Sequence, residues 1–364
     1  MKKVLNWNQD IEDESKMNKT IQKTLLACVL QQGFWDRWFS HGIEPNVINK
    51  KKQQLATLEG WVRTLEHRAS ELSQLAMTHE RNQDHLEAAH HYALSGLYYC
   101  LLQWIFPVQC DAKAEWYGLC VSQMNKADAV SPYKKTRHTL RRGDVQYVGK
   151  VSEPLAPSKG VVIIVTPIDS AKEELFSYEQ DFLRGGFSVV IFDGPGQGET
   201  VLETGHKASQ QHCHSFLEAV IRFSHHAFPD LPLHLFGTSS GATWSLEGGK
   251  NPLISKVIAV SPATKHDIHM PDFFKERMEN TLEDFNQGFL PPLAEREKLN
   301  QVVLFHGKED VMVDKRDLLD LYENLSEPKR FIEYEGEGHC CNFKLSEIRA
   351  RSMKWLKGEK IHGI

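Results

Sequence analysis

The apolar run Leu231–Phe236 leads directly into the turn Gly237-x-Ser239-x-Gly241, and Ala242–Glu247 after it is able to form a helix. A strand, a sharp turn and a helix in this order are the context in which a Gly-x-Ser-x-Gly match forms a nucleophile elbow. The serine takes unfavourable backbone angles in such a turn, and the glycines let strand and helix approach closely. Matches of this length also arise by chance in ordinary turns, so the motif alone leaves both interpretations open.

Two polar residues downstream follow strand-like runs, in the chain order serine, acid, histidine that this kind of fold uses. Asp310 follows the run Gln301–His306, and His339 follows the run Lys329–Tyr334. The carboxyl ends of parallel strands meet at one edge of a sheet, where open α/β sheets collect their active sites. We therefore predict that Ser239, Asp310 and His339 form a catalytic triad.

Each member of this set has an alternative. Asp310 could cap the helix that begins just after it, and Glu309 or Asp314 could be the acid instead. His339 could be a surface residue, because it is one of 18 histidines. Two glycines, at positions 336 and 338, favour the catalytic role, since a loop of low bulk lets an imidazole reach a serine from another strand.

The segment Phe182–Glu199 ends in the run D-G-P-G-Q-G-E, which is much more specific than a Gly-x-Ser-x-Gly match. Together with the preceding Ile168–Glu174, it resembles the FrsA-like branch of the α/β-hydrolases. This branch includes 2,6-dihydroxypseudooxynicotine hydrolase and fungal pigment enzymes that shorten a polyketide by cleaving a carbon–carbon bond. The resemblance covers residues 137–357 by motif. It implies an α/β-hydrolase fold, a mostly parallel sheet flanked by helices, with an all-helical N-terminal domain.

The β-branched run Val161–Val165 predicts a strand that is buried on both faces. In the α/β-hydrolase fold the loop after this strand supplies one backbone N–H of the oxyanion hole, and the residue after the nucleophile supplies the other. The family commonly has two glycines where this chain has Thr166 and Pro167, which leaves the donor on this loop in question. Because proline has no N–H, we assign the two donors to Ile168 and Ser240.

Asp169 occupies a position to which the resemblance gives an auxiliary acid role in carbon–carbon cleavage. Aspartate is also a favoured helix N-cap, so a structural role is the alternative and both stay open. The sequence Ser170–Glu173 fits a capping box, and we expect a helix to begin there.

The chain divides near residue 137. Before it, apolar residues recur at helical spacing, for example Leu55, Leu58, Trp61, Val62 and Leu65. We predict that residues 1–136 form a helical domain that contributes to the substrate pocket. Aromatic residues are dense at 34–43 and 98–106; most should be core, and a minority could line that pocket.

Strands and helices alternate after residue 137, so residues 137–364 are predicted to form the α/β catalytic domain. Residues 137–140 and 145–148 should form an antiparallel pair, and a helix is expected near 206–228. Residues 262–299 are predicted to form a helical insertion between strands. Insertions at this edge of the sheet often act as lids.

Composition agrees with a large globular enzyme, with 41% hydrophobic and 25% charged residues. The net charge of −5 gives no reason to expect nucleic acid or an anionic membrane as a partner. The first ten residues lack the apolar core of a signal peptide, so a cytoplasmic location is expected. The seven cysteines show no paired spacing, and groupings such as His266 with His269 lack regular ligand spacing. We expect no metal and no cofactor.

The leading hypothesis is a serine hydrolase that forms an acyl-enzyme from a moderately apolar small molecule. A polyketide-derived molecule is one option for this substrate. The scissile bond is an ester or a β-diketone-like carbon–carbon bond, and the triad does not decide between them. The alternatives are an oligopeptidase-like amide hydrolase and a non-catalytic FrsA-like regulatory binding protein. Whether the helical domain forms a homodimer stays open.

Overall fold

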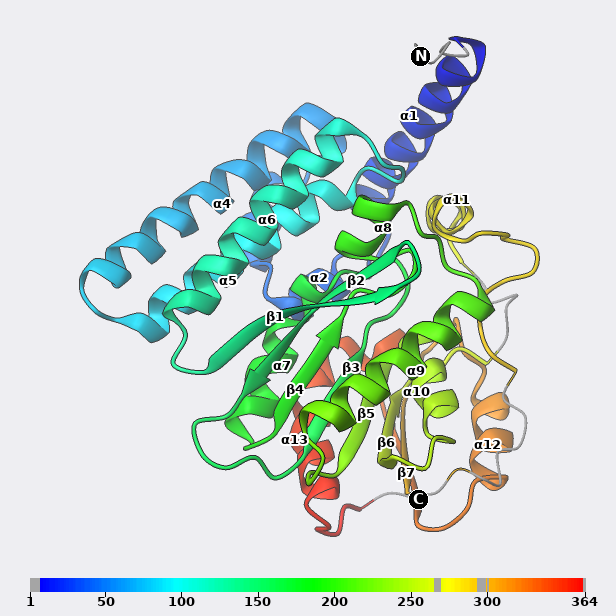
Figure 1. Cartoon of the computed structure of the whole chain (residues 1–364). Helices are drawn as coiled ribbons and strands as arrows, with labels where there is room; N and C mark the ends of the chain where they lie inside the picture. Colours follow the sequence, from blue (N-terminus) through cyan, green and yellow to red (C-terminus); the bar gives the residue numbers. More distant parts are fainter. Residues whose placement is uncertain (1–6, 265–269, 293–298, 300, 363–364) are drawn as a thin grey trace. The chain divides into compact units, whose positions relative to one another are not determined.

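The computed structural model describes residues 7–264, 270–292, 299 and 301–362 (Figure 1). They form two compact units, each of which is described by itself. One unit is helical and comprises the residues up to Ala127 together with Met270–Asn280. The other is an α/β unit that comprises Asp128–His269 and Thr281–Ile364. Residue 137, where the sequence analysis divides the chain, lies within the first strand of the α/β unit.

The helical unit is built from long helices joined by short turns. Its elements are α1 (Trp7–Leu30), α2 (Asp36–His41), α3 (Pro45–Lys51), the 3₁₀ segment η1 (Gln54–Ala56), α4 (Leu58–Arg81), α5 (His85–Trp104), α6 (Asp111–Val130) and α11 (Asp272–Thr281). Helix α4 buries one stripe at helical spacing, namely Trp61, Leu65, Ala69, Leu72 and Ala76. Helix α5 is buried almost all round over its second half, which explains why its sequence there is mostly apolar.

Aromatic rings form the core around the N-terminal end of α2. Trp38 and Trp104 meet edge to face with ring centroids 5.5 Å apart, and Trp35 stacks on Trp61 at 5.6 Å. The side chain of Arg277 on α11 is buried and lies 4.1 Å above the ring of Trp104. The predicted core role of most of these aromatic side chains is therefore confirmed.

Helix α11 comes from the predicted insertion at 262–299, and it packs in the helical unit. Thr20 on α1 donates a hydrogen bond of 2.8 Å to Glu276, Lys16 lies 3.1 Å from Glu279, and Phe34 packs against Phe273. Residues 265–269 and 293–298 of the insertion lie outside the described residues. A lid function for the insertion stays a prediction.

The α/β unit contains one eight-stranded sheet in the order β1-β2-β4-β3-β5-β6-β7-β8. Its strands are β1 (Lys134–Arg142), β2 (Val145–Glu153), β3 (Val161–Val165), β4 (Ser188–Phe192), β5 (Leu233–Thr238), β6 (Ile254–Val260), β7 (Val302–Gly307) and β8 (Lys329–Tyr334). Strand β2 pairs antiparallel with β1 and β4, and the pairs from β4 to β8 are parallel. The predicted fold class and the predicted antiparallel first pair are confirmed.

Helices cover both faces of this sheet (Figure 1). They are α7 (Phe176–Arg184), α8 (Gly198–Thr204), α9 (Gln210–Ala227), α10 (Ser240–Gly248), α12 (Lys315–Glu323) and α13 (Leu345–Leu356), with the 3₁₀ segments η2 (Lys172–Leu175) and η4 (His339–Lys344). The core between the sheet and α7 and α13 includes Phe182, Phe236, Phe305 and Ile348. Strands β3 and β4 are almost entirely apolar because both faces of the sheet are covered.

The predicted capping box at Ser170–Glu173 is displaced by one residue. The helical segment begins at Lys172 with Ala171 as its N-cap, and the carboxylate of Glu174 accepts a hydrogen bond of 3.2 Å from the Ala171 N–H. The carboxylate of Glu173 lies 2.7 Å from the Lys172 ammonium instead. Glu173, which was predicted to complete the capping box, therefore forms an ion pair, and Glu174 bonds the N-cap instead.

A buried group of charges joins α7 to the antiparallel edge of the sheet. Glu179 lies 3.1 Å from the ammonium of Lys135 and 3.0 Å from that of Lys150, and it accepts a hydrogen bond from Ser152. Asp128 pairs with both lysines. Burial by itself raises the pKa of Glu179, but the two lysines lower it to about 2.

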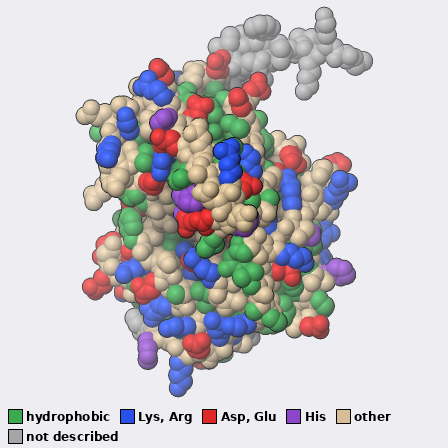
Figure 2. All heavy atoms as spheres, turned by 90° about the vertical axis from the view of Figure 1, so that its left-hand side faces the viewer, with side chains coloured by type: hydrophobic (Ala, Val, Ile, Leu, Met, Phe, Trp, Pro, Cys, Tyr) green, Lys and Arg blue, Asp and Glu red, His purple; other side chains and the backbone are tan. Residues whose placement is uncertain are grey.

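The outer surface carries both signs of charge, interspersed on the face shown in Figure 2.

We predict that Glu179→Gln lowers the free energy of unfolding by about 3 kcal/mol, because it removes one partner from a buried ion-pair group. Urea unfolding at pH 7 measures this loss. Glu153→Gln breaks the exposed pair between Lys134 and Glu153 and should cost less than about 1 kcal/mol.

The pH dependence gives a second check on Glu179. Its carboxyl has a lowered pKa in the folded state, so its contribution is complete above the unfolded value near 4.5 and disappears as the pH falls through about 2. The difference between wild type and Glu179→Gln should shrink over that interval. A difference that is constant with pH would contradict the ion-pair explanation.

Candidate active site

Ser239 lies in a strained turn between β5 and α10. Its backbone angles are φ 53° and ψ −126°, a conformation that non-glycine residues rarely adopt. A Cβ on Gly237 would lie 2.2 Å from the carbonyl oxygen of Gly241, and a Cβ on Gly241 would lie 2.2 Å from that of Val165. Both glycines are therefore needed for the close approach of α10 to the sheet. The geometry is that of a nucleophile elbow.

A chain of hydrogen bonds links the three predicted catalytic side chains. The Oγ of Ser239 lies 2.8 Å from Nε2 of His339, and Nδ1 of His339 lies 2.9 Å from Oδ2 of Asp310. The three residues follow β5, β8 and β7, so they meet at the carboxyl edge of the sheet. In this arrangement the imidazole is able to accept the serine proton while the carboxylate holds the ring in place.

Asp310 is oriented by its own loop. Its Oδ1 accepts hydrogen bonds of 2.8 Å and 3.0 Å from the backbone N–H groups of Met312 and Val313, which leaves Oδ2 directed at His339. The N-cap of α12 is Asp314, whose side chain accepts from the Arg316 N–H, and Glu309 is exposed. The structure thus brings Asp310 to the histidine and leaves both alternative acids elsewhere.

The environment shifts the pKa of both partners. Burial by itself lowers the pKa of His339, but Cys340 and Asp310 outweigh burial and raise this pKa well above 6.5. Burial by itself raises the pKa of Asp310, while the bonds to His339 and to two backbone N–H groups bring it below its ordinary value. The pair is therefore ionised more readily than either group would be alone.

The loop that carries His339 is bonded to Ser261, the residue that directly follows β6. The backbone N–H of Cys340 donates to Oγ of Ser261, 3.2 Å away, and the Ser261 N–H donates to the carbonyl of Phe305. Cys340 and Cys341 both have left-handed backbone angles, with φ 66° and 50°. Two consecutive residues in this region bend the chain sharply, which places the imidazole over the sheet edge.

The two predicted oxyanion donors are neighbours in space. The Ile168 N–H donates a hydrogen bond of 2.8 Å to the side-chain Oγ of Ser240. A substrate oxygen therefore has to share or replace this contact before it binds the Ile168 N–H. Asp169 has φ 60°, and the N-cap of the next helical segment is Ala171. The chemical role of Asp169 stays a prediction.

One side chain that contacts this loop was missed in the sequence analysis. The buried amide of Gln197 makes four hydrogen bonds: it donates to the carbonyls of Thr166 and Pro167 and accepts from the Thr166 hydroxyl and the Gly194 N–H. Gln197 belongs to the D-G-P-G-Q-G-E run. In the sequence that run indicates the family resemblance. Its polar residues were the available signal that the run also makes hydrogen bonds within the fold.

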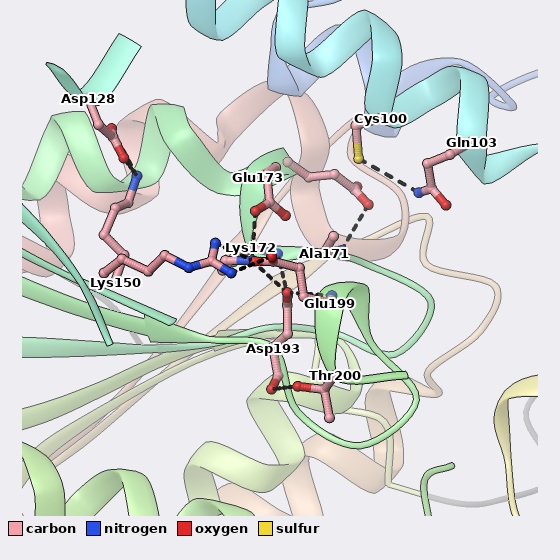
Figure 3. Close-up of polar contacts among 12 residues, drawn as sticks. Cys100, Gln103, Asp128, Lys150, Ala171, Lys172, Glu173, Asp193, Glu199 and Thr200 are labelled. Atoms are coloured by element: carbon pink, nitrogen blue, oxygen red, sulfur yellow. Dashed lines mark hydrogen bonds and ion pairs between the residues drawn. The ribbon is translucent and has the colours of Figure 1, made fainter. Parts of the chain in front are cut away.

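A second group that the sequence analysis missed surrounds Lys172, at the end of the same loop. Figure 3 shows the ammonium of Lys172 between the carboxylates of Glu173, Asp193 and Glu199, at 2.7, 2.7 and 2.6 Å. These three carboxylates are close enough together to hold a metal ion. The lysine already supplies the positive charge, and its neighbours raise its pKa well above 10.5 although burial lowers it. The site is a salt-bridge network in which Arg137 also binds Glu199.

Comparison with known proteins finds partial matches to hydrolases. Residues 156–298 match the model of the serine aminopeptidase S33 family. The alpha/beta hydrolase ucsC of Acremonium is 25% identical over 197 residues, which cover 47% of this chain and 40% of that protein. The match thus spans less than half of the curated relative's length. The family match covers less than half of this chain, and both matches agree with the predicted resemblance to the α/β-hydrolases.

Similar solved structures agree in fold. That of 2,6-dihydroxy-pseudo-oxynicotine hydrolase has a TM-score of 0.75 and 20% identity, covering 91% of this chain and 98% of that one. AbyA5 has a TM-score of 0.58 and 14% identity, covering 80% and 89%. These likenesses show the fold, which is the predicted α/β-hydrolase fold with an N-terminal helical region. Among the helices in the described part of the chain, none is long and apolar enough to cross a bilayer.

We predict that Asp310→Asn lowers the pKa of His339, because it removes the carboxylate that stabilises the imidazolium. An NMR titration of selectively labelled histidine measures this pKa, with His339→Gln used to assign the signal. Wild type should titrate above 6.5.

Glu309→Gln and Asp314→Asn are matched controls, since each removes a nearby carboxylate while the groups that raise the His339 pKa are Cys340 and Asp310. Both should leave the His339 titration where it is in wild type. An equal shift in a control, or none in Asp310→Asn, would show that Asp310 does not set the charge of this imidazole.

Proposed function

We propose that this chain is a serine hydrolase that cleaves an ester or an activated carbon–carbon bond through an acyl-enzyme. Ser239 is the nucleophile, His339 the general base and acid, and Asp310 the residue that orients the imidazole. The backbone N–H groups of Ile168 and Ser240 hold the oxyanion. The observation that carries the proposal is the hydrogen-bond chain from Ser239 through His339 to Asp310, which starts from a strained elbow.

The reaction follows from this geometry in two halves. In its neutral form His339 accepts the Ser239 proton while Oγ attacks the substrate carbonyl, and the developing negative oxygen binds the two N–H groups. The tetrahedral intermediate then expels its leaving group, which accepts from His339 the proton that came from Ser239. The acyl group remains on Ser239 as an ester. Water then attacks this ester while His339 takes its proton. The bond between the acyl carbon and Oγ breaks, His339 returns the proton to Ser239, and the acid is released.

The leaving group distinguishes the two versions of the proposal. An ester loses an alkoxide, which the imidazolium protonates to an alcohol. A β-diketone loses an enolate carbon, which the same proton converts to a ketone. The fold likeness to 2,6-dihydroxy-pseudo-oxynicotine hydrolase supports including an activated carbon–carbon bond, in a moderately apolar or polyketide-derived substrate. In that version Asp169 is the proposed auxiliary acid.

Amide hydrolysis is the second candidate, because the matching family model describes serine aminopeptidases. The same nucleophile attacks an amide, and His339 then protonates the leaving amine. A panel of p-nitrophenyl esters, aryl 1,3-diketones and aminoacyl p-nitroanilides separates the candidates by kcat/KM. The proposal also includes a small-molecule substrate as the partner and a cytoplasmic location. It further includes a homodimer, and light scattering measures the molar mass that tests for it.

We predict that Ser239→Ala reduces turnover by a factor of about 10⁴ or more, because no other group replaces the nucleophile. Covalent labelling by a fluorophosphonate probe should be lost as well. Ser215→Ala, which changes an exposed serine of α9, should keep both activity and labelling.

Circular dichroism should show that Ser239→Ala retains the wild-type fold. Hydrolysis of short p-nitrophenyl esters that persists in this variant would refute the role of Ser239. Failure of the wild-type protein to label and to hydrolyse the panel would favour the non-catalytic binding protein.

A further inference from the structure

We propose that Gln197 is a positioning residue that aims the Ile168 N–H at the oxyanion. This inference rests on the proposed function and deepens it. Gln197 is only 6% exposed and lies in the tight turn Gly194–Gly198 at the carboxyl end of β4. Its side chain crosses to the loop that follows β3, the adjacent parallel strand.

The four hydrogen bonds of Gln197 leave its amide one orientation. Nε2 donates to the carbonyl oxygens of Thr166 and Pro167, at 3.1 Å and 2.9 Å. Oε1 accepts from the Thr166 hydroxyl and from the Gly194 N–H, both at 2.7 Å. A flipped amide would place donors against the Gly194 N–H and oxygen against two carbonyls, so the network selects a single rotamer.

The bond to the Pro167 carbonyl controls the Ile168 N–H directly. That C=O and that N–H belong to one peptide unit, which is planar and in its trans form points the two groups in opposite directions. The proline ring fixes φ of Pro167, but rotation about the Cα–C bond, ψ, still turns the peptide plane. By holding the oxygen, Gln197 fixes ψ and therefore the direction of the N–H on the other side.

The other side of this peptide faces the nucleophile turn. The Ile168 N–H donates to Ser240 Oγ at 2.8 Å, and Ser240 directly follows Ser239. The peptide between Pro167 and Ile168 is thus held between Gln197 and the first residue of α10. In this position the N–H points toward the turn that presents the nucleophile, as an oxyanion donor requires.

The far end of the loop is anchored by Asp193, the residue directly before the same turn. Asp193 is fully buried, and its Oδ1 accepts from the backbone N–H of Lys172 at 2.8 Å. Its Oδ2 accepts from the Lys172 ammonium at 2.7 Å and from the Glu199 N–H at 3.0 Å. Asp193 therefore fixes the loop at Lys172, and Gln197 orients the part of the loop that carries the Ile168 N–H.

The test compares variants of Gln197 in the full chain, with the p-nitrophenyl ester that wild type hydrolyses fastest. Gln197→Leu removes all four bonds, and Gln197→Glu keeps the shape and the acceptor oxygen but loses the donor to the Pro167 carbonyl. Both should lower kcat by about a hundredfold, the loss expected when a catalytic group is misplaced by about 1 Å. KM should stay within about threefold of wild type, because ground-state binding does not need this N–H.

Two controls isolate the donor bonds. Thr166→Val removes one hydroxyl but leaves Nε2 of Gln197 on both carbonyls, and it should lose far less kcat than Gln197→Leu. Gln211→Leu changes an exposed glutamine on α9 and should behave as wild type. Inhibition by phenylboronic acid, which forms a tetrahedral adduct on the serine, should weaken in parallel with kcat in the Gln197 variants only.

The outcomes separate this inference from the function on which it rests. Wild-type turnover that persists in Ser239→Ala would overturn the proposed function. Ser239-dependent turnover that is unchanged in a folded Gln197 variant, or a loss that appears in KM, overturns the positioning role alone. If both Gln197 variants lose cooperative thermal unfolding, the residue maintains the fold and the positioning role is overturned as well.

Discussion

The strained backbone of Ser239 is the constraint on which the site depends. A residue with φ 53° persists only where the surrounding structure holds it, and here the strand before it and the helix after it do so. Contact between α10 and the sheet needs glycine at both Gly237 and Gly241. Because this turn is fixed, the serine oxygen has one position, and the loops after β3, β7 and β8 have to be built around it.

Those loops are held by buried polar side chains. Asp310 uses one carboxylate oxygen for its own backbone and the other for His339, so the histidine is positioned by a group that is itself fixed. The loop after β3 has a comparable support in Gln197 and in the ion pairs of Lys172. Replacing one partner in such a network leaves the others buried and unsatisfied, which makes the arrangement costly to distort.

The convergence of Ser239, Asp310 and His339 could be predicted because each follows a strand, and the ends of parallel strands share an edge. Local sequence patterns did not predict the hydrogen bonds between side chains and residues that are distant in the sequence. Gln197 reaches a loop 30 residues earlier, and the competition of Lys172 for Glu173 moved the helix cap by one position. The helical insertion predicted at 262–299 includes α11, but the local sequence carries no information on which neighbours the side chains of α11 contact.

The route of the chain through α11 has a consequence for dissecting the molecule. The polypeptide leaves the α/β unit after β6, supplies one helix to the helical unit, and returns before β7. No single cut between the two units therefore yields both of them whole. A fragment that begins at Asp128 would retain α11 while losing Thr20, Phe34 and Trp104, the partners of its Glu276, Phe273 and Arg277. Stable separate expression requires a redesigned connection in place of this excursion.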